Sequence, residues 1–243
     1  MTEAIVIEQL TKRYKQKTAV NSVQLSIHEG ELFGLLGVNG AGKTTLIHML
    51  CGLMTPTSGN ATILGYDMKR QRDRIQPHIA VAPQELAIAP NLTVEENLML
   101  IANIYGLTKK EATTRVQKVM MELSLTPFAK QRGKTLSGGW QRRLSIAMAL
   151  LTSPKILFLD EPTLGLDILG RRELWHMIEQ LKQHTTIILT THYLEEAEAL
   201  CDRICVMKDG DMKALGTTAE LCDMTQTTSF EEAFISLVTE VAR

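Results

Sequence analysis

The first third of the chain moves from strand-like to helical patterns of apolar residues. Ile5-Val6-Ile7 is a short apolar run, and Val23 to Ile27 alternates apolar with polar residues, as a half-buried antiparallel strand does. Glu31 to Leu36 is more continuously apolar and leads into a glycine-rich loop, after which Thr44 to Leu53 has helical spacing. These segments predict an antiparallel portion followed by a buried strand and its crossover helix.

The middle of the chain changes to helical patterning. Thr93-Val94-Glu95-Glu96 and Thr108-Lys109-Lys110-Glu111 both match the capping box, in which two side chains satisfy unpaired N–H groups at a helix start. Helical spacing follows each box. We therefore expect residues from Thr93 to about Leu151 to form an all-helical insertion.

The remainder alternates apolar runs with amphipathic segments. The pattern predicts strands over residues 61–64, 79–81, 156–159, 186–189 and 203–207, and helices over residues 171–182 and 193–200. A third capping box, Ser229-Phe230-Glu231-Glu232, predicts a C-terminal helix. Strands that alternate with helices imply a largely parallel sheet, so we expect an α/β fold with a mixed sheet and an antiparallel β portion.

Composition narrows the classes of partner. The 243 residues carry a formal net charge of −1, and 22% of them are charged. A near-neutral chain has no global attraction for nucleic acid, so we expect no nucleic-acid partner. The basic cluster from Lys69 to Arg74 is interpreted as a solvated face.

The sequence also indicates a cytoplasmic location. Its N-terminus lacks the basic stretch followed by an apolar one that marks a signal peptide, and no apolar run approaches the roughly 18–20 residues that span a bilayer. None of the four cysteines forms a C-x-x-C pair or has zinc-like spacing to a histidine, which is typical of reduced thiols. If the chain serves a membrane process, we expect another chain to supply the membrane part.

The strongest motif is a glycine loop between a predicted strand and a predicted helix. It reads G-x-x-x-x-G-K-T, in which glycines let backbone N–H groups surround phosphate oxygens and the following helix directs its positive dipole end at them. Lys43 adds a point charge for the β- and γ-phosphates, and the Thr44 hydroxyl can bind Mg²⁺. The residues expected to contact ATP here are Gly37, Asn39, Gly40, Ala41, Gly42, Lys43, Thr44 and Thr45.

Two acidic residues end the apolar strand over residues 156–159. Ligands of open α/β sheets bind at the carboxyl ends of strands, so Asp160 can reach the Mg²⁺ shell. Glu161 can orient or deprotonate the attacking water. Combined with the glycine loop, the pair predicts ATP hydrolysis.

Ser137-Gly138-Gly139 opens a predicted helix. Its exposed N–H groups can bind an anion, and the same residues can equally form a simple helix cap. The residues by themselves leave both interpretations open.

These motifs and several shorter ones occur in the order found in the ATP-binding cassette (ABC) ATPases, which the chain resembles from end to end. The resemblance makes Ser137-Gly138-Gly139 part of the signature motif that binds nucleotide. The family's remaining contacts fall on Tyr14 for adenine, Gln84 for Mg²⁺ and the attacking water, Asp167 for the D-loop, and His192 for the switch histidine.

The resemblance also implies an architecture, a P-loop NTPase core within one ABC ATPase domain over residues 1–243. Residues 1–92 and 152–220 would form a RecA-like core with an antiparallel β subdomain. Residues 93–151 would form the inserted helical subdomain, and residues 221–243 a C-terminal helix.

Three segments resemble the subgroup that serves ABC-2 type exporters, which includes daunorubicin-resistance-type ATPases. They are Thr191 to Ala197, Phe230 to Phe234, and the signature continuation Gln141 to Leu144; Trp140 departs from the family, where Gln is common and Met is frequent in this subgroup. The resemblance implies a homodimer that encloses two ATP molecules, transmembrane permease partners, and a peripheral position on the cytoplasmic face of the membrane.

Three other functions compete with this interpretation. A soluble ABC ATPase acting on ribosomes or DNA usually has tandem cassettes or a long coiled-coil insertion, and this chain has neither. A regulator without turnover is disfavoured by Glu161 and His192. A small-molecule kinase would have no use for Ser137-Gly138-Gly139.

Overall fold

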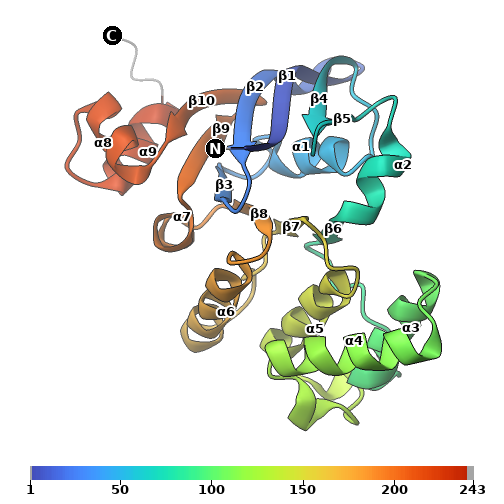
Figure 1. The fold of residues 1–243 in the computed structure, drawn as a ribbon. Coiled ribbons are helices and arrows are strands. Elements are labelled where there is room, and N and C mark those ends of the chain that lie inside the picture. Colours follow the sequence, from blue (N-terminus) through green and yellow to red (C-terminus); the bar gives the residue numbers. More distant parts are fainter. Residues whose placement is uncertain (1, 240–243) are drawn as a thin grey trace.

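The computed structural model describes residues 2–239, and within them the strands form two sheets (Figure 1). The strands are β1 (Glu3–Tyr14), β2 (Lys17–His28), β3 (Leu32–Leu36), β4 (Ser58–Ile63), β5 (Tyr66–Asp67), β6 (Ile79–Ala82), β7 (Ile156–Asp160), β8 (Thr186–Thr191), β9 (Arg203–Lys208) and β10 (Asp211–Gly216). The smaller sheet is antiparallel, in the order β2-β1-β4-β5. The larger has the order β10-β9-β3-β8-β7-β6 and is parallel except for the β9–β10 pair. The predicted α/β class with mixed and antiparallel sheets is confirmed.

Helices cover the larger sheet and extend from both ends of the molecule. They are α1 (Lys43–Leu50), α2 (Arg72–Ile75), α3 (Val94–Ile104), α4 (Lys109–Glu122), α5 (Gly138–Leu150), α6 (Ile168–Leu181), α7 (Leu194–Leu200), α8 (Thr218–Thr225) and α9 (Phe230–Thr239). Helices α3, α4 and α5 gather at one end, whereas α8 and α9 lie beside β10 at the other (Figure 1). Among residues 2–239, no helix combines the length and apolar character needed to cross a bilayer.

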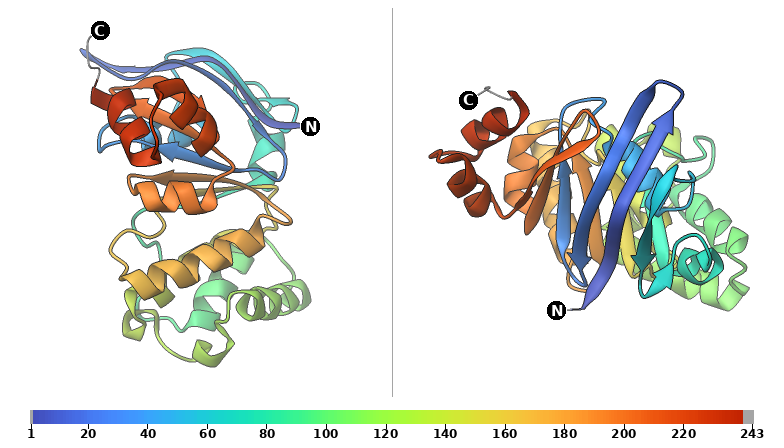
Figure 2. Two further views of the ribbon diagram at one scale, coloured as in Figure 1. Left: turned by 90° about the vertical axis from the view of Figure 1, so that its left-hand side faces the viewer. Right: turned by 90° about the horizontal axis from the view of Figure 1, so that it is seen from above.

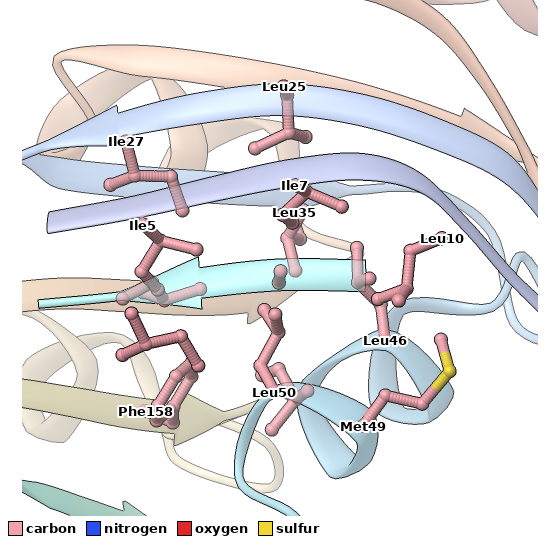
Figure 3. Close-up of a cluster of buried hydrophobic side chains, with 14 of the residues drawn as sticks. Ile5, Ile7, Leu10, Leu25, Ile27, Leu35, Leu46, Met49, Leu50 and Phe158 are labelled. Carbon is pink, nitrogen blue, oxygen red and sulfur yellow. The ribbon is translucent and has the colours of Figure 1, made fainter. Parts of the chain in front are cut away.

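One hydrophobic core lies between the two sheets. Ile5 and Ile7 of β1, Leu46 of α1 and Phe158 of β7 belong to one cluster of fully buried side chains (Figure 3). Helix α1 therefore sits between the antiparallel sheet and the larger sheet, which fixes the loop that precedes it. Figure 2 shows the antiparallel strands on one side of the larger sheet and the inserted helices on the other.

A second core fixes the inserted helices. Leu144 of α5 packs in one cluster with Leu157 and Leu159 of β7 and Leu174 of α6. Because residues alternate along β7, Phe158 faces the first core and its neighbours face the second. The strand that carries the acidic pair is thus packed on both faces.

Local signals account for the start of the inserted helices. Thr93 Oγ1 accepts a hydrogen bond from Glu96 N, and the Glu96 carboxylate accepts one from Thr93 N. Thr108 and Glu111 form the same reciprocal pair at the start of α4. Both capping boxes are confirmed.

Some predicted boundaries are wrong, for identifiable reasons. Strand β1 continues to Tyr14, well beyond the predicted run from Ile5 to Ile7. The prediction missed the rest because a register shift between Ile7 and Leu10 interrupts the alternation of apolar and polar residues. Helix α1 ends at Leu50 rather than Leu53, and Gly52, with φ of 71°, supplies the left-handed residue that follows many helix ends.

The C-terminal part also departs from expectation. Ser229 Oγ accepts from Glu232 N, but the Glu232 carboxylate accepts from Thr228 rather than Ser229, so the third capping box is only half formed. Sequence analysis missed β10 and α8, whose Thr217–Glu220 capping box is complete. Residues 240–243 of the predicted C-terminal segment lie outside the described residues.

Candidate nucleotide site

Four neighbouring strands end at one edge of the larger sheet, and each leads into a predicted site residue. Strand β3 leads into the glycine loop, β8 into His192, and β7 into Glu161, while Gln84 follows β6. These strands are parallel neighbours in the order β3-β8-β7-β6. The topology therefore brings motifs from distant parts of the sequence to the edge where α/β folds bind ligands.

The glycine loop is shaped by close backbone contacts. A Cβ at Gly37 would lie 2.4 Å from Met207 O, and one at Gly42 would lie 2.3 Å from Ala19 O. Gly42 also has φ of 104° as the residue preceding α1. Glycine is therefore required at both ends of the loop, whose middle faces open space.

Lys43 places a buried ammonium group inside this loop. Its Nζ donates to Gly37 O at 2.6 Å and lies 3.9 Å from Glu161 Oε1, while the side chain is 5% exposed. Burial lowers the pKa of Lys43, and the nearby negative charges of Glu161 and Asp160 oppose that shift. An anion entering the loop would favour the charged form of Lys43 in the same way.

Asp160 is buried beneath the loop at the end of β7. Its Oδ1 accepts hydrogen bonds from the hydroxyls of Thr44, at 3.2 Å, and Thr190. The carboxylate is 4% exposed, so these partners fix its orientation. A hydroxyl and a carboxylate oxygen thus lie side by side, and the Asp160 charge is close enough to act on the pKa of Lys43.

Glu161 directs its side chain toward His192. Glu161 Oε1 lies 3.1 Å from His192 Nδ1, and the Glu161 N–H donates to the carbonyl and hydroxyl oxygens of Thr190. Glu161 has φ of 47°, in the left-handed region that non-glycine residues seldom adopt. Because the backbone changes direction abruptly after β7, the Asp160 carboxylate faces Thr44 and the Glu161 carboxylate faces His192.

A cavity of about 550 Å³ opens in front of these groups. The predicted site residues that line it are Tyr14, Asn39, Gly40, Ala41, Gly42, Lys43, Thr44, Thr45, Gln84, Glu161 and His192. Gly37 and Asp160 lie behind this lining, where they hold Lys43 and Thr44 by the hydrogen bonds described above. Tyr14 is 43% exposed at the end of β1.

The other predicted site residues line a separate pocket of about 390 Å³. Ser137, Gly138, Gly139 and Asp167 all belong to it, together with Trp140. Ser137 precedes α5 but its side chain makes no capping hydrogen bond. Asp167 caps α6 by accepting from Gly170 N at 2.7 Å, which is why α6 begins at Ile168 rather than at the predicted Arg171.

The Trp140 indole packs beside the signature segment. Its ring centroid is 4.2 Å from that of Phe128, and the Arg143 guanidinium lies 4.5 Å from the indole centroid. The indole is therefore held by its own helical region while it lines the second pocket.

Sequence analysis missed residues that complete the cavity. Lys17, Ala19 and Leu164 also line it, and Thr190 orients Asp160. Two threonines follow the apolar run Ile187 to Leu189 at residues 190–191, and they are the sequence signal for Thr190. Rim residues such as Lys17 carry no signal in the sequence, because the antiparallel sheet brings them to the cavity.

The family model described as ABC transporter matches residues 20–164 of the chain. The chain belongs to the ABC transporter family. Within it, the chain is an ATP-binding subunit and an ATPase, as its similarity to other members indicates. A second model, described as "AAA domain, putative AbiEii toxin, Type IV TA system", matches residues 134–196.

Relatives of this ABC ATPase include two bacterial ATP-binding proteins. It is 44% identical over 216 residues to the linearmycin resistance ATP-binding protein LnrL of Bacillus subtilis, covering 88% of this chain and 70% of that protein. It is 38% identical over 240 residues to the probable multidrug ABC transporter ATP-binding protein YbhF of Escherichia coli, covering 96% of this chain and 41% of YbhF. The chain thus spans less than half of YbhF.

A solved structure has the same fold. The dimeric post-hydrolysis state of the ATP-binding cassette MJ0796 bound to ADP and Pi is 28% identical, with a TM-score of 0.78. The match covers 88% of this chain and 98% of that one. These names do not favour the alternative of a soluble ATPase that acts on ribosomes or DNA.

Proposed function

We propose that this ABC ATPase hydrolyses Mg²⁺-bound ATP as one half of a homodimer that powers an ABC-2 type exporter. The observation that carries the proposal is the division of the predicted site residues between two pockets of one chain. The larger cavity has the phosphate loop and the acidic residues, and the smaller pocket has the exposed start of the signature helix. In a head-to-tail pair, the smaller pocket of each subunit would face the larger cavity of the other.

The larger cavity fits a nucleotide triphosphate and its metal. The glycine loop and Lys43 suit phosphate, and the Tyr14 ring is exposed for stacking on adenine. Mg²⁺ would be held by oxygens of Thr44, Gln84 and Asp160, and when bound it would neutralise charge on the phosphates. No group of three His, Cys, Asp or Glu side chains within residues 2–239 could hold a metal ion, which fits an ion that is bound largely by phosphate oxygens and water.

Hydrolysis in this proposal depends on Glu161. Its carboxylate would accept a proton from the attacking water, and His192 Nδ1, 3.1 Å from Glu161 Oε1, would keep it oriented. Gln84 would orient the same water from the adjacent strand. Lys43 would stabilise negative charge on the transferred phosphoryl group.

The signature segment would complete the site of the second subunit. Ser137 has a hydroxyl free of any capping role, and the first N–H groups of α5 form a positive helix end. Gly138 and Gly139 leave space for a phosphate to approach this backbone, and Asp167 would define the adjoining D-loop. The dimeric state of MJ0796 with ADP and Pi supports this arrangement.

The exporter assignment rests on the relatives. The LnrL protein is named for linearmycin resistance and YbhF for a multidrug transporter. We infer by analogy that this chain works with transmembrane permease subunits and lies against the cytoplasmic face of the membrane. The division into a core of residues 1–92 and 152–220, a helical subdomain of residues 93–151 and a C-terminal segment is part of this proposal.

The variant Glu161→Gln tests the shared site. Loss of the general base is expected to slow phosphate release by about 10²–10⁴-fold, while ATP still binds and holds the two subunits together. The measurements are steady-state phosphate release and size-exclusion chromatography with ATP, with ADP and without nucleotide. The matched control is Glu195→Gln, because Glu195 is also near His192 in sequence but its side chain is 83% exposed.

We expect an ATP-dependent dimer of Glu161→Gln and a monomer with ADP. Near-normal turnover of this variant would contradict the role of Glu161. A variant that binds ATP but remains monomeric at all protein concentrations would contradict the shared site.

A further inference from the structure

Arg142 connects the signature helix to the segment that contains Gln84. It lies on α5, one turn after Gly139, and is 5% exposed. Nη1 donates to Pro83 O at 2.8 Å, and Nη2 donates to Gln84 O at 2.9 Å. One guanidinium group thus holds two consecutive carbonyl groups of the chain after β6.

The environment of this guanidinium group is unusual for a cation. Within residues 2–239, Arg142 forms no ion pair at salt-bridge distance. Burial lowers the pKa of Arg142, and the negative charge of Asp160 opposes that shift. Burying a cation is unfavourable unless its geometry is well satisfied, and the planar fork of arginine matches two neighbouring carbonyl groups.

The contact leaves the Gln84 side chain free. Arg142 binds main-chain oxygens, so it fixes the path of the segment without engaging the side chain of Gln84, a residue that lines the larger cavity. At the start of the same helix, Ser137, Gly138 and Gly139 line the smaller pocket. Arg142 is therefore a direct side-chain link between a residue of one pocket and the helix that forms the other.

We propose that Arg142 is a positioning residue that couples the two nucleotide sites of the dimer. A change in the position of Gln84 on nucleotide binding in one site moves α5, and with it the anion-binding helix start in the opposite site. This coupling rests on the proposed shared-site function. Without the two hydrogen bonds of the Arg142 guanidinium group, each subunit still binds ATP, but binding at one site no longer changes the affinity of the other site.

Three variants test the coupling. Arg142→Met removes both hydrogen bonds while keeping an unbranched side chain. Arg142→Lys keeps the charge but has a single nitrogen, so it restores only part of the contact. Arg115→Met is the matched control, because Arg115 Nε donates at 3.0 Å to Leu151 O, just beyond the opposite end of α5.

The experiment measures hydrolysis rate against ATP concentration, together with the affinity of a fluorescent ATP analogue for the isolated subunit. For two coupled sites the wild-type Hill coefficient lies between 1 and about 2. We expect a Hill coefficient of about 1 for Arg142→Met, an intermediate value for Arg142→Lys, and the wild-type value for Arg115→Met. Analogue affinity should stay within about twofold of wild type in all three, because no Arg142 atom lines the larger cavity.

Each outcome decides the proposal. A wild-type Hill coefficient for the Arg142→Met variant overturns the proposal. If that variant does not fold, a wild-type Hill coefficient for Arg142→Lys overturns it instead. Loss of analogue binding to the Arg142→Met subunit also overturns it, because Arg142 would then support the local site alone. A non-cooperative wild type, together with a monomeric Glu161→Gln variant, overturns the shared site itself and this coupling with it.

Discussion

The two pockets of this ABC ATPase differ in how completely the chain builds them. In the larger cavity, Lys43 and Asp160 are buried and each is held by hydrogen bonds to neighbouring residues. In the smaller pocket, Ser137 and Gly138 are exposed, and the Ser137 side chain lacks a capping bond. The first arrangement is preorganised by the sheet, whereas the second leaves donors without a capping role, which the proposed dimer would direct at the nucleotide of the other subunit.

This difference separates two kinds of contribution. Groups preorganised within one subunit set nucleotide affinity before assembly. In the proposed dimer, groups that face outward would act only when a second subunit brings its nucleotide, so their loss would affect association. Variants in the two pockets are therefore expected to give different experimental signatures.

The largest expected effect is that of Lys43→Ala on the larger cavity. Removing a buried, hydrogen-bonded charge typically costs roughly 2–5 kcal/mol, so ATP affinity of the isolated subunit should fall by at least about 30-fold. Isothermal titration or a fluorescent analogue measures this. The control is Lys17→Ala, which removes an exposed charge from the rim of the same cavity and should change affinity only by a small factor. Equal losses in the two variants would contradict the preorganised loop.

An intermediate effect is expected for Ser137→Ala in the smaller pocket. A hydrogen bond to a charged group contributes about 1.5–3 kcal/mol, so ATP-dependent association should weaken about 10- to 100-fold when measured in the Glu161→Gln background. ATP affinity of the single subunit and thermal stability should not change, because Ser137 makes no capping hydrogen bond. Thr135→Ala is the control, since the Thr135 hydroxyl donates locally to Arg132 O at 2.8 Å. Reduced ATP binding by the single subunit would remove the distinction between the pockets.

The smallest effect concerns Glu196, which links the helices that follow the two pockets. The Trp175 Nε1–H on α6 donates to Glu196 Oε1 on α7 at 3.1 Å, and Glu196 is fully buried. Burial raises the pKa of Glu196, and the hydroxyls of Thr191 and Thr163 and the Trp175 N–H oppose part of this shift. The folded state thus holds the proton more tightly than the unfolded state does.

The sign of the pH dependence follows from this raised pKa. The neutral carboxyl group contributes fully below the unfolded pKa of about 4.3, and its contribution is lost as pH rises toward the folded value. Glu196→Gln should therefore raise the Tm at pH 8, by about 2–4 °C for each kcal/mol recovered in a domain of this size, and raise it less at pH 5. Thermal unfolding at both pH values measures this difference. A larger gain at pH 5 would contradict the raised pKa, and altered ATP affinity would show that Glu196 also acts on the cavity.

The sequence pattern predicted what short-range physics determines. The glycine loop, the apolar strand before Asp160 and the capping boxes at Thr93 and Thr108 each depend on residues close together in the chain. The family and the ATPase activity followed from their joint order, and the comparisons confirm both. The roles of the individual site residues remain predictions.

Long-range contacts escaped the same reasoning. The fork of Arg142 reaches carbonyl groups whose positions depend on how β6 packs against α5, and no local pattern marks them. The approach of Ala19 O to Gly42 depends likewise on how β2 lies over the glycine loop. The observed end of β1 and the observed start of α6 differ from the predicted ones. One extra residue in a bulge of β1 and one hydrogen bond at the Asp167 cap are enough to shift these boundaries.

The position of Trp140 has a consequence for spectroscopy. The chain contains two tryptophans. Trp140 lines the smaller pocket, whereas the Trp175 indole N–H donates a hydrogen bond to the buried carboxyl group of Glu196. An indole at that surface senses the polarity of whatever covers it, through the wavelength and intensity of its emission. If the proposed dimer forms, the natural sequence thus includes an optical reporter of subunit contact, spatially separate from the larger cavity.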